Sequence, residues 1–593
     1  MNLDQLLREE ITKAFSSLFD VEPPHLQIQP INPEFEGSHT LVCFPLAKIS
    51  KKNPQETAQL IGEYLNANSK VVSHFNVVKG FLNLSLGHQI WREVFKAIAS
   101  EEDYGVVKPT GKEIMVEYSS PNTNKPLHLG HLRNNFLGWS VASIYQAIGY
   151  KVHKVQIIND RGIHICKSMA AWKTRGNGET PDSSGLKGDK LVGKYYVIFD
   201  QMQKAQVSDL IAKGRSKEDA EKETSIMKLA IDMLQKWEQK DEEVVSLWRT
   251  MNGWVYAGFE ATYKQMGVDF DKLYFESETY LLGKEEVLKG VEKGVFFKKE
   301  DGSVWVDLTE DGLDQKVLLR SDGTSVYMTQ DIGTAILRFR DFPKISRQVY
   351  TVGNEQEYHF KVLFLILAKL GYQWAKECYH LSYGMVDLPS GKMKSREGTV
   401  VDADDLMQEM IEEAEKQTKE LGKIEELKEP EAIELFETIG IGALKFYLLK
   451  VDPKKRMMFD PNESIQLQGH TGPFVQYTHA RIRAILRKAE STSLKPADKT
   501  DDNSLFEPEI TLINLLSAYP ARLRDAAKDY SPAVIANYAY DLAKAYNHFY
   551  QSIPIFSGDD ASQLEFRVAL SQKVGEVINK AMALLGIRVP ERM

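Results

Sequence analysis

The sequence predicts an α/β protein of several domains, built around a doubly wound parallel sheet. Two buried strand patterns, KEIMVEYSS (112–120) and HKVQIINDRG (153–162), flank a helical pattern, and this alternation is typical of parallel strands with helical crossovers. At 593 residues the chain should hold about three to five domains. From about residue 455 the pattern becomes all helical.

The composition excludes several classes of protein and bears on the cellular compartment. Hydrophobic residues make up 43% and charged residues 26%, and no apolar run reaches the ~18–20 residues of a membrane span. The net charge of −9 argues against indiscriminate binding to nucleic acid. Cys43, Cys166 and Cys378 lie far apart, which favours neither a disulfide framework nor a metal site. Without a secretory signal at the N-terminus, we expect a cytoplasmic protein.

Residues 1–107 are predicted to form a small α/β domain. The first helix places apolar residues from Leu3 to Leu18 at helical spacing, and FLNLSL (81–86) closes the domain as a strand. Phe81 and Asn83 lie two apart and therefore on one face of that strand. A strand Phe is usually core, whereas Asn is a poor strand former, so Asn83 is the less expected residue.

Residues 108–455 are predicted to form the domain with the parallel sheet, interrupted by a mostly helical, charged insertion at approximately 165–310. Ligands bind such sheets beyond the carboxyl ends of the strands. The polar residues that follow the first two strands should therefore meet at one mouth: Glu117, Ser119, Ser120, Asn122, Asn159 and Asp160.

The stretch His128-Leu129-Gly130-His131 opens a predicted helix directly after the first strand. A helix N-terminus offers free N–H groups to phosphates, and Gly130 allows a ligand to approach closely. The two imidazoles can donate hydrogen bonds to a phosphate on which charge develops. So short a pattern also recurs by chance, and a structural pair of histidines is the alternative.

After the insertion, the segments 303–311 and 316–339 are expected to resume the sheet. Tyr327 and Asp331 are spaced i and i+4, so one helical face can present both. A further strand ends at Gly353 and leads into a helix that carries Gln356. The basic tip KMKSR (392–396) lies on a Gly-containing loop and could clamp phosphates, with a plain surface loop as the alternative.

Residues 456–593 are predicted to form a helical bundle. His479, Arg483 and Arg487 are spaced to form one basic stripe, and Phe474 and Tyr477 precede them. Aromatic rings interleaved with Arg suit unstacked RNA bases. An aromatic-rich helical core is the alternative for each ring.

Taken together, these segments resemble class I aminoacyl-tRNA synthetases in their arginyl form. The similarity rests on SSPNTNKPLHLGHLRN, INDRG, RSDGTSVYMTQDIG, VGNEQEYHF, YGMV, QGHTGPFVQYTHARI and LLGIRVPERM, in the family's order over nearly the whole chain. The resemblance implies a Rossmann-like catalytic domain with an insertion, an N-terminal extra domain that binds the tRNA elbow, and a C-terminal helical anticodon-binding domain.

The resemblance also implies the reaction. ATP with Mg²⁺ would activate L-arginine to arginyl-adenylate, and the arginyl group would pass to the 3′ end of tRNA(Arg), with activation dependent on bound tRNA. The expected partners are tRNA(Arg), L-arginine and ATP. We expect no DNA or membrane partner, no tightly bound structural metal, and a monomer.

The resemblance and the site chemistry together assign roles to individual residues. The motif region runs from Asn122 to Leu132. Arginine binding falls to Glu117, Ser120, Asn122, Tyr327, Asp331 and Gln356. Catalysis falls to His128, His131, Lys125, Lys392 and Lys394. ATP binding falls to His128, Gly130, His131, Gly384, Met385, Val386, Lys392 and Lys394. Contact with tRNA falls to Phe81, Asn83, Phe474, Tyr477, Arg483, Tyr546, Tyr550 and Met593.

Two segments depart from the family's pattern. In Lys392-Met393-Lys394-Ser395-Arg396, a serine stands where the family's catalytic lysine usually lies, and Lys394, Lys392 and Lys125 remain alternative sources of the charge. The stretch 34–48 lacks the family's usual Gly-Asp-aromatic-Ala-Thr-Asn run, which leaves its role open.

Other functions are disfavoured by particular residues. A non-catalytic tRNA-binding paralogue would have lost site residues that are all present here. A class I synthetase for another amino acid is a further alternative, which a competition assay across amino acids would distinguish. A stand-alone nucleotidylyltransferase would need neither this length nor a helical C-terminal domain.

Overall fold

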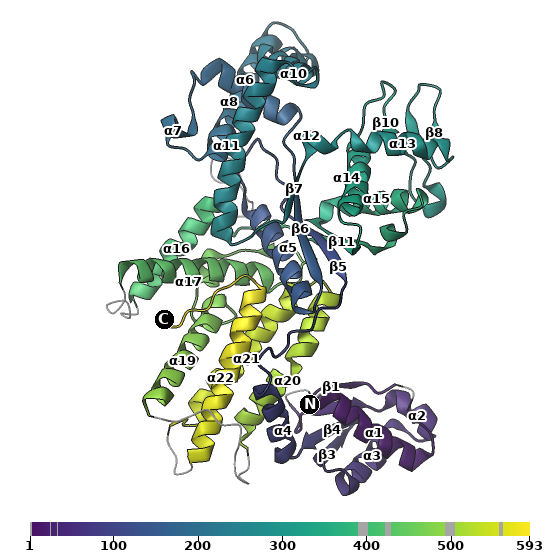
Figure 1. Cartoon of the computed structure of the whole chain (residues 1–593), viewed down its shortest axis with the longest axis vertical. Coiled ribbons are helices and arrows are strands. Elements are labelled where there is room, and N and C mark those ends of the chain that lie inside the picture. The colour runs from purple at the N-terminus through teal and green to yellow at the C-terminus, as the bar shows by residue number, and fades with distance from the viewer. Residues whose placement is uncertain are drawn as a thin grey trace.

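The computed structural model describes residues 3–23, 25–31, 34–389, 401–420, 428–492, 505–556 and 561–593. In Figure 1 the central parallel sheet with its appended helices lies above a long helical bundle, and the N-terminal α/β unit lies beside the lower end of that bundle. Among the described residues, no helix is long and apolar enough to cross a membrane.

The N-terminal unit is a four-stranded antiparallel sheet covered by helices. Its strands β1 (Ile28–Pro30), β2 (His39–Val42), β4 (Phe81–Leu86) and β3 (Val72–Val78) lie in that order. The helices are α1 (Leu3–Phe19), α2 (Phe44–Ser50) and α3 (Pro54–Asn68), and α4 (His88–Ala99) leads onward. The apolar residues of α1 are buried at the predicted spacing, from Leu3 through Leu7 and Ile11 to Phe15.

The central sheet has five parallel strands in the order β12-β11-β5-β6-β7. They are β12 (Cys378–Tyr383), β11 (Ile345–Gly353), β5 (Glu113–Glu117), β6 (Lys151–Ile158) and β7 (Lys272–Phe275). The chain builds outward from β5 to β6 and β7 on one side and later adds β11 and β12 on the other. The predicted doubly wound sheet is confirmed, and its switch point lies between β5 and β11, where such folds bind ligands.

One sheet prediction was wrong. The segments 303–311 and 316–339 do not rejoin the parallel sheet. Instead β8 (Phe297–Lys298), β9 (Val304–Val306) and β10 (Lys316–Leu319) form a separate antiparallel sheet, whose apolar residues share a hydrophobic core with the helices at 327–341 and 357–369. Short strands joined by tight turns pair with each other locally, whereas a parallel strand needs a long crossover.

The insertion is mostly helical, as predicted. Its longer helices are α6 (Ile163–Arg175), α8 (Gly188–Ala212), α10 (Ser225–Glu238) and α11 (Glu242–Met266), with α7 (Pro181–Ser184) and α9 (Lys217–Glu223) between them. They stand together above the sheet (Figure 1). The chain then returns through β7 and the helices α12 (Glu276–Thr279) and α13 (Leu282–Glu292).

Two long helices already precede the part of the chain that was expected to be all helical from about residue 455. The helices α16 (Ala403–Glu420) and α17 (Glu429–Leu449) precede α18 (Pro461–Ser464) and α19 (Gly472–Ser491). The bundle continues with α20 (Glu507–Lys528), α21 (Pro532–Ser552) and α22 (Ala561–Leu584). Two short strands, β13 (Val386–Asp387) and β14 (Met457–Met458), pair in parallel and tie the end of the sheet domain to the bundle.

Helix α5 (Leu129–Ala147) connects the mouth of the sheet to the bundle. It is buried on most sides and packs against α17, α20, α21 and α22 as well as the sheet. The Ser140 hydroxyl donates to the carbonyl of Leu584 over 2.8 Å, and the Tyr145 hydroxyl donates to that of Ala527 over 3.0 Å. A single helix therefore links the two histidines at its own N-terminus to the contacts between the domains.

The fully buried Arg133 of α5 holds two loops at once. Its Nη1 donates to the carbonyls of Gly384 (2.7 Å) and Lys455 (3.0 Å). Its Nη2 donates to those of Asp452 and Pro453, each over 3.3 Å. Burial lowers the pKa of Arg133 to about 10, so the guanidinium remains charged at neutral pH. Carbonyl oxygens thus bind the two terminal nitrogens of this buried cation, and the nearby carboxylate of Asp452 partly offsets the effect of burial on its pKa.

We expect Arg133→Lys to lower stability by about 2–3 kcal/mol, because a single ammonium cannot reach all four carbonyls and leaves buried acceptors unpaired. The measurement is thermal unfolding followed by circular dichroism. Arg340→Lys on α14 (Tyr327–Asp341) is the matched control, because Arg340 is exposed. An equal thermal midpoint for the two variants would contradict the role given to Arg133.

Candidate functional site

A cavity of 570 Å³ opens at the carboxyl ends of β5 and β11, beside the switch point of the sheet. Its wall includes residues from β5, the loop after it, α14 and the turn after β11. All six residues predicted to bind arginine line it: Glu117, Ser120, Asn122, Tyr327, Asp331 and Gln356. Asn159, predicted at the same mouth, also lines it, so the two strand ends do meet.

The loop after β5 has an unusual backbone. Ser119 and Ser120 have φ values of 80° and 44°, in the left-handed region that residues with a Cβ rarely adopt. The Ser119 N–H donates to Asn134 Oδ1 over 2.6 Å, and its hydroxyl lies 2.7 Å from that of Tyr263. These contacts hold the strained turn and direct Ser120 to the cavity. No glycine marks the turn, so the sequence carries no signal for it.

Glu117 is already paired inside the protein. It is buried, and its Oε2 accepts a hydrogen bond from the guanidinium of Arg338, which is itself fully buried. Its Oε1 accepts from the Ser120 hydroxyl over 3.0 Å. The charge of Glu117 is therefore balanced by Arg338, a residue whose helical position in the sequence did not point to this role.

Asp331 is the accessible acid of the cavity. Its side chain is 42% exposed, and its Oδ2 lies 2.5 Å from His359 Nε2, which leaves Oδ1 open. Tyr327, one turn earlier on α14, is 76% exposed at the same wall. Gln356 reaches the cavity from the 3₁₀ turn η2 (Asn354–Gln356) ahead of α15 (Glu357–Lys369). The predicted i, i+4 pair thus does share one face.

Glu276, which the sequence reasoning did not select, also lines the cavity. Burial raises its pKa to about 7; Arg161 opposes this shift, while Asp160 and Asp331 add to it. Glu276 begins α12 directly after β7, at the carboxyl end of an edge strand of the central sheet. Assigning β7 to the main sheet would have exposed this signal.

The two histidines cap helix α5 together. The Gly130 N–H donates to His128 Nδ1, and the His128 N–H donates to His131 Nδ1, each over 3.1 Å. The two ring centroids lie 3.9 Å apart. A Cβ on Gly130 would lie 3.1 Å from the His128 ring, so this glycine makes room for the cap itself.

These contacts set the protonation of both rings. A backbone N–H can only donate, so each Nδ1 is an acceptor and each neutral ring carries its proton on Nε2. Burial, with Lys125 nearby, lowers the pKa of His128 to about 4. Burial, His128 and Lys125 lower the pKa of His131 well below its ordinary value. The pair therefore offers two neutral Nε2–H donors at neutral pH.

The predicted lysines divide into two groups. Lys125 is half-buried beside the histidines, and burial lowers its pKa. Lys392 and Lys394, together with the rest of the KMKSR tip, lie outside the described residues. The chain is described again from Val401, whose carbonyl accepts from the Leu129 N–H over 3.2 Å, while the Ala403 N–H donates to Leu127 over 2.9 Å.

Gly384, Met385 and Val386, predicted to bind ATP, follow β12, and the Gly384 carbonyl accepts from Arg133. A Cβ on Gly384 would lie 2.6 Å from the Lys455 carbonyl, so this position needs glycine. Val386 is buried and paired in β13, whereas Met385 is 40% exposed. Asp160, expected at the mouth, is instead buried and bonded to Ser277 and Tyr256.

The N-terminal candidates differ in exposure. Phe81 is half-buried and packs edge-on against Phe44, with ring centroids 5.4 Å apart. Asn83 is buried: its Oδ1 accepts from Thr40 over 2.7 Å, and its amide donates to Asn76 over 2.8 Å. Cross-strand bonding thus explains an Asn in this strand. The unusual stretch 34–48 supplies Thr40 and Phe44 to the same face.

The C-terminal candidates also separate into core and surface. Tyr546 is fully buried in the bundle, whereas Tyr550 is 43% exposed. The Arg481 guanidinium lies 5.0 Å from the Tyr477 ring and 4.9 Å from the Tyr550 ring, which joins the two at one surface. Phe474 packs against Tyr540 at 5.3 Å.

The predicted basic stripe is partly covered by the C-terminal tail. His479 Nδ1 lies 3.0 Å from the Pro590 carbonyl, and Arg483 pairs with Glu591. Arg487 donates to the Glu591 carbonyl over 3.1 Å. Met593 packs against the same side and lines a small hollow with Tyr477. The basic stripe therefore binds the C-terminal tail of the chain itself, which the sequence pattern alone did not indicate.

Comparisons with known proteins agree over the whole chain. The family model "tRNA synthetases class I (R), catalytic domain" matches residues 93–460, "DALR anticodon binding domain" matches 475–593, and "Arginyl tRNA synthetase N terminal domain" matches 1–86. An arginine–tRNA ligase of Bacteroides thetaiotaomicron is 55% identical over 598 residues, covering 100% of both chains. One from Flavobacterium psychrophilum is also 55% identical, with 100% of both chains covered.

Solved structures show the same fold. The Thermus thermophilus arginyl-tRNA synthetase superposes with a TM-score of 0.80 at 24% identity, covering 100% of both chains. The Plasmodium falciparum arginyl-tRNA synthetase gives 0.75 at 17% identity, covering 100% of this chain and 99% of the other. At these identities the structures support the fold alone.

The histidine cap makes a prediction about titration. We expect His128 to titrate near pH 4 and to show the Nε2–H tautomer at pH 7 in nitrogen-detected histidine NMR, because burial disfavours its cation. The signal is assigned by its loss in His128→Asn. A histidine in a short model peptide is the reference and titrates at about 6.5. An Nδ1–H tautomer, or a midpoint near 6.5 for His128, would contradict the cap geometry.

Proposed function

The chain belongs to the arginyl-tRNA synthetases, and from that membership we propose that it joins L-arginine to tRNA(Arg) at the expense of ATP. One observation carries the proposal: the segment from Glu117 to His131, at the switch point of the sheet, joins the wall of an acid-lined cavity to a neutral histidine pair. A cationic amino acid fits the first, and a triphosphate fits the second.

The reaction has two steps. An oxygen of the arginine carboxylate attacks the α-phosphorus of ATP, the bond to the β-phosphate oxygen breaks, and pyrophosphate leaves. A hydroxyl of the tRNA 3′-terminal ribose then attacks the arginyl carbonyl carbon, and AMP leaves. The Nε2–H groups of His128 and His131 would donate to phosphate oxygens as charge shifts toward pyrophosphate. Neutral donors fixed in advance stabilise such charge without reorganising.

The acids of the cavity would bind the guanidinium. The second carboxylate oxygen of Asp331 is not the one that contacts His359, and Glu276 lies on the same cavity with the charge of Arg161 near it. A planar guanidinium can bond both carboxylates, and Tyr327 and Gln356 add hydrogen-bonding groups. Lysine would leave part of this acid pair unsatisfied, which is costly in a buried site.

The loop after β5 would hold the other end of the amino acid. Glu117, fixed by Arg338 and Ser120, presents a side chain whose charge is already balanced. This favours a polar contact with the α-ammonium over a full ion pair with the guanidinium. Asn122 is exposed at the same wall and can donate to the carboxylate.

Mg²⁺ would enter with ATP. Among the described residues, no group of three or more His, Cys, Asp and Glu side chains is placed to hold a metal ion. Magnesium in nucleotide sites is commonly bound by phosphates and water, with few protein ligands. The described donor set therefore fits an ion that the triphosphate carries.

The tRNA would contact both ends of the molecule. The surface made by Tyr477, Arg481 and Tyr550 suits unstacked anticodon-loop bases. Phe474, Arg483 and Met593 lie around it, and Tyr546 supports it from the core. Phe81 and Asn83 mark the N-terminal face proposed for the tRNA elbow. A monomer without DNA partners, located in the cytoplasm, completes the proposal.

The direct test is ATP–pyrophosphate exchange with arginine, measured with and without tRNA(Arg). We expect exchange when tRNA is present, and arginylation of the tRNA in the matching assay. Lysine in place of arginine is the specificity control. Absence of exchange and of arginylation under every condition, with tRNA still bound, would identify a non-catalytic tRNA-binding paralogue instead.

The pKa of Glu276 predicts how arginine binding depends on pH. In the free site this pKa is about 7, and a bound guanidinium favours the carboxylate, so binding releases a proton below that pH. We expect the dissociation constant for arginine to rise as pH falls below 7, by up to about tenfold per pH unit. Isothermal titration calorimetry in two buffers measures both the affinity and the released proton.

Matched variants isolate this effect. Glu276→Gln should weaken arginine binding at pH 8 and remove the pH dependence near pH 7, because the carboxyl with a pKa of about 7 is then gone. Glu278→Gln changes an exposed acid on the same short helix that does not line the cavity, and it should behave as the wild type. Wild-type affinity that is constant from pH 6 to 8, or full affinity in Glu276→Gln, would rule out this role.

A further inference from the structure

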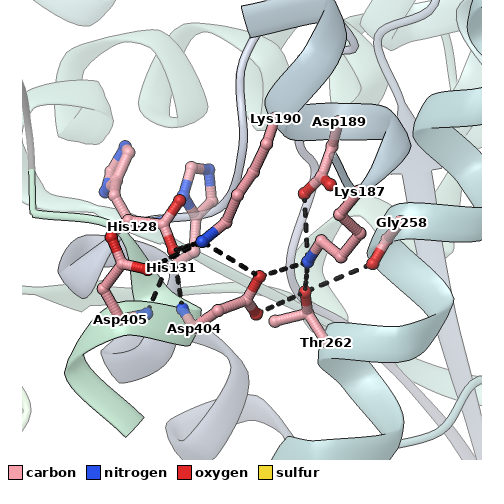
Figure 2. Close-up of polar contacts among 10 residues, drawn as sticks. His128, His131, Lys187, Asp189, Lys190, Gly258, Thr262, Asp404 and Asp405 are labelled. Atoms are coloured by element: carbon pink, nitrogen blue, oxygen red, sulfur yellow. Dashed lines mark hydrogen bonds and ion pairs between the residues drawn. The ribbon is translucent and has the colours of Figure 1, made fainter. Parts of the chain in front are cut away.

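A group of charged residues joins the helical insertion to the segment that packs on the histidine cap. Lys187 and Lys190 lie at the start of α8, and Asp402, Asp404 and Asp405 lie at the start of α16; we call these five the α8–α16 ion cluster. The two helices are far apart in the sequence. Figure 2 shows Lys190 reaching toward Asp404 and Asp405, beside His128 and His131.

Lys190 contacts all three acids. Its Nζ lies 2.7 Å from Asp405, 3.3 Å from Asp402 and 4.0 Å from Asp404. Burial alone would lower the pKa of Lys190, but the bonds to Asp405 and Asp402 raise it above the ordinary value. The side chain is 29% exposed, so this is a partly buried network and not a single surface pair.

Lys187 extends the cluster into the insertion. It pairs with Asp404 and lies 3.3 Å from the fully buried Asp189, and its Nζ is 2.5 Å from the Thr262 hydroxyl (Figure 2). That hydroxyl donates to Asp404 Oδ1 over 2.8 Å. Residues of both α8 and α11 thus bind Asp404, and these contacts hold the first turn of α16 in place.

The acids lie opposite the histidine cap. Asp402 forms an antiparallel bridge with His128, flanked by the backbone bonds of Leu127 and Leu129 to 401 and 403. In this arrangement the two facing residues approach closely with their side chains on the same face. Asp402 Oδ1 also accepts from the N–H groups of Asp404 and Asp405, over 2.9 Å and 3.2 Å, which caps α16. Moving Asp402 therefore moves the backbone that flanks His128.

The cluster also affects the charge near the phosphates. Its three acids, two lysines and the adjacent Asp189 sum to −2 when all are ionised, since four carboxylates face two ammonium groups. Removing Lys190 would make this −3, close to where a triphosphate would bind. Removing Lys190 would therefore both displace Asp402 and make the charge near the phosphates more negative, and both changes would weaken ATP binding.

We propose that Lys190, assisted by Lys187, is a positioning residue for the adenylation step: it fixes Asp402 and the start of α16 against Leu127–Leu129 and so sets the histidine cap for ATP. The inference rests on the proposed function. Lys190 acts through Asp402 and not by touching arginine, so it governs the ATP side of the reaction and leaves the acid-lined cavity unchanged. The insertion thereby contributes to catalysis through its charges.

The test is steady-state ATP–pyrophosphate exchange in the presence of tRNA(Arg), with ATP and arginine varied separately. We expect Lys190→Met to lower kcat/KM for ATP by about 10- to 100-fold, because small misplacements of catalytic groups are costly. KM for arginine should stay within about twofold of the wild type. Lys190→Arg keeps the charge and should restore most of the loss.

The matched control is Lys194→Met. Lys194 lies one turn further along α8 and pairs with Glu179 at 2.8 Å, away from α16. Its loss should leave both KM values near the wild type. An equal defect in Lys194→Met, parallel changes in KM for ATP and arginine, or unchanged kinetics in Lys190→Met would each overturn the inference.

A second variant covers loss of folding. If Lys190→Met lowers the thermal midpoint, Asp402→Asn is measured instead, because Asn still caps a helix while its bond to Lys190 loses charge. It should show the same selective loss for ATP, and wild-type kinetics would overturn the proposal. If the wild-type protein shows no ATP–pyrophosphate exchange, both the proposed function and this inference are rejected. If the wild type is active and the variants match it, only this inference is rejected.

Discussion

The buried guanidinium of Arg133 is the contact on which the geometry of the site depends. It lies one turn into α5, two residues beyond His131, and holds the loops at Gly384 and at 452–455 through their carbonyls. The same helix is capped by the histidine pair and is packed into the bundle further along. Helix α5 therefore fixes the positions of the histidines, the loop at Gly384 and the bundle relative to one another.

Charge balance explains how the cavity can remain ready for a cation. Glu117 is neutralised by Arg338, Asp331 shares a contact with His359, and Glu276 is held near its protonation point by burial. Three fully ionised acids without partners would repel one another in a confined space. The protein keeps one acid paired and one able to give up its proton as the guanidinium arrives. Recognition and the pH response then have the same origin.

Much of this arrangement could be predicted from local patterns, and the remainder depends on contacts between distant segments. The strand ends, the histidine cap and the Tyr327–Asp331 pair follow from short-range spacing. Arg133 could not be assigned, because its partners lie 251 to 322 residues away. Glu276 was missed because β7 was not placed in the main sheet. The burial of Asn83 and the covering of Arg483 by Glu591 likewise arise only when the chain folds.

The most direct test of this account is a crystal structure with a non-hydrolysable arginyl-adenylate analogue and tRNA(Arg). The account predicts the guanidinium between Asp331 and Glu276, and the α-phosphate group within hydrogen-bonding distance of Nε2 of both His128 and His131. Glu117 should still be bonded to Arg338. A guanidinium bound elsewhere, or histidine rings turned so that Nδ1 faces the phosphate, would contradict the division of the site into an acid-lined cavity and a neutral histidine cap.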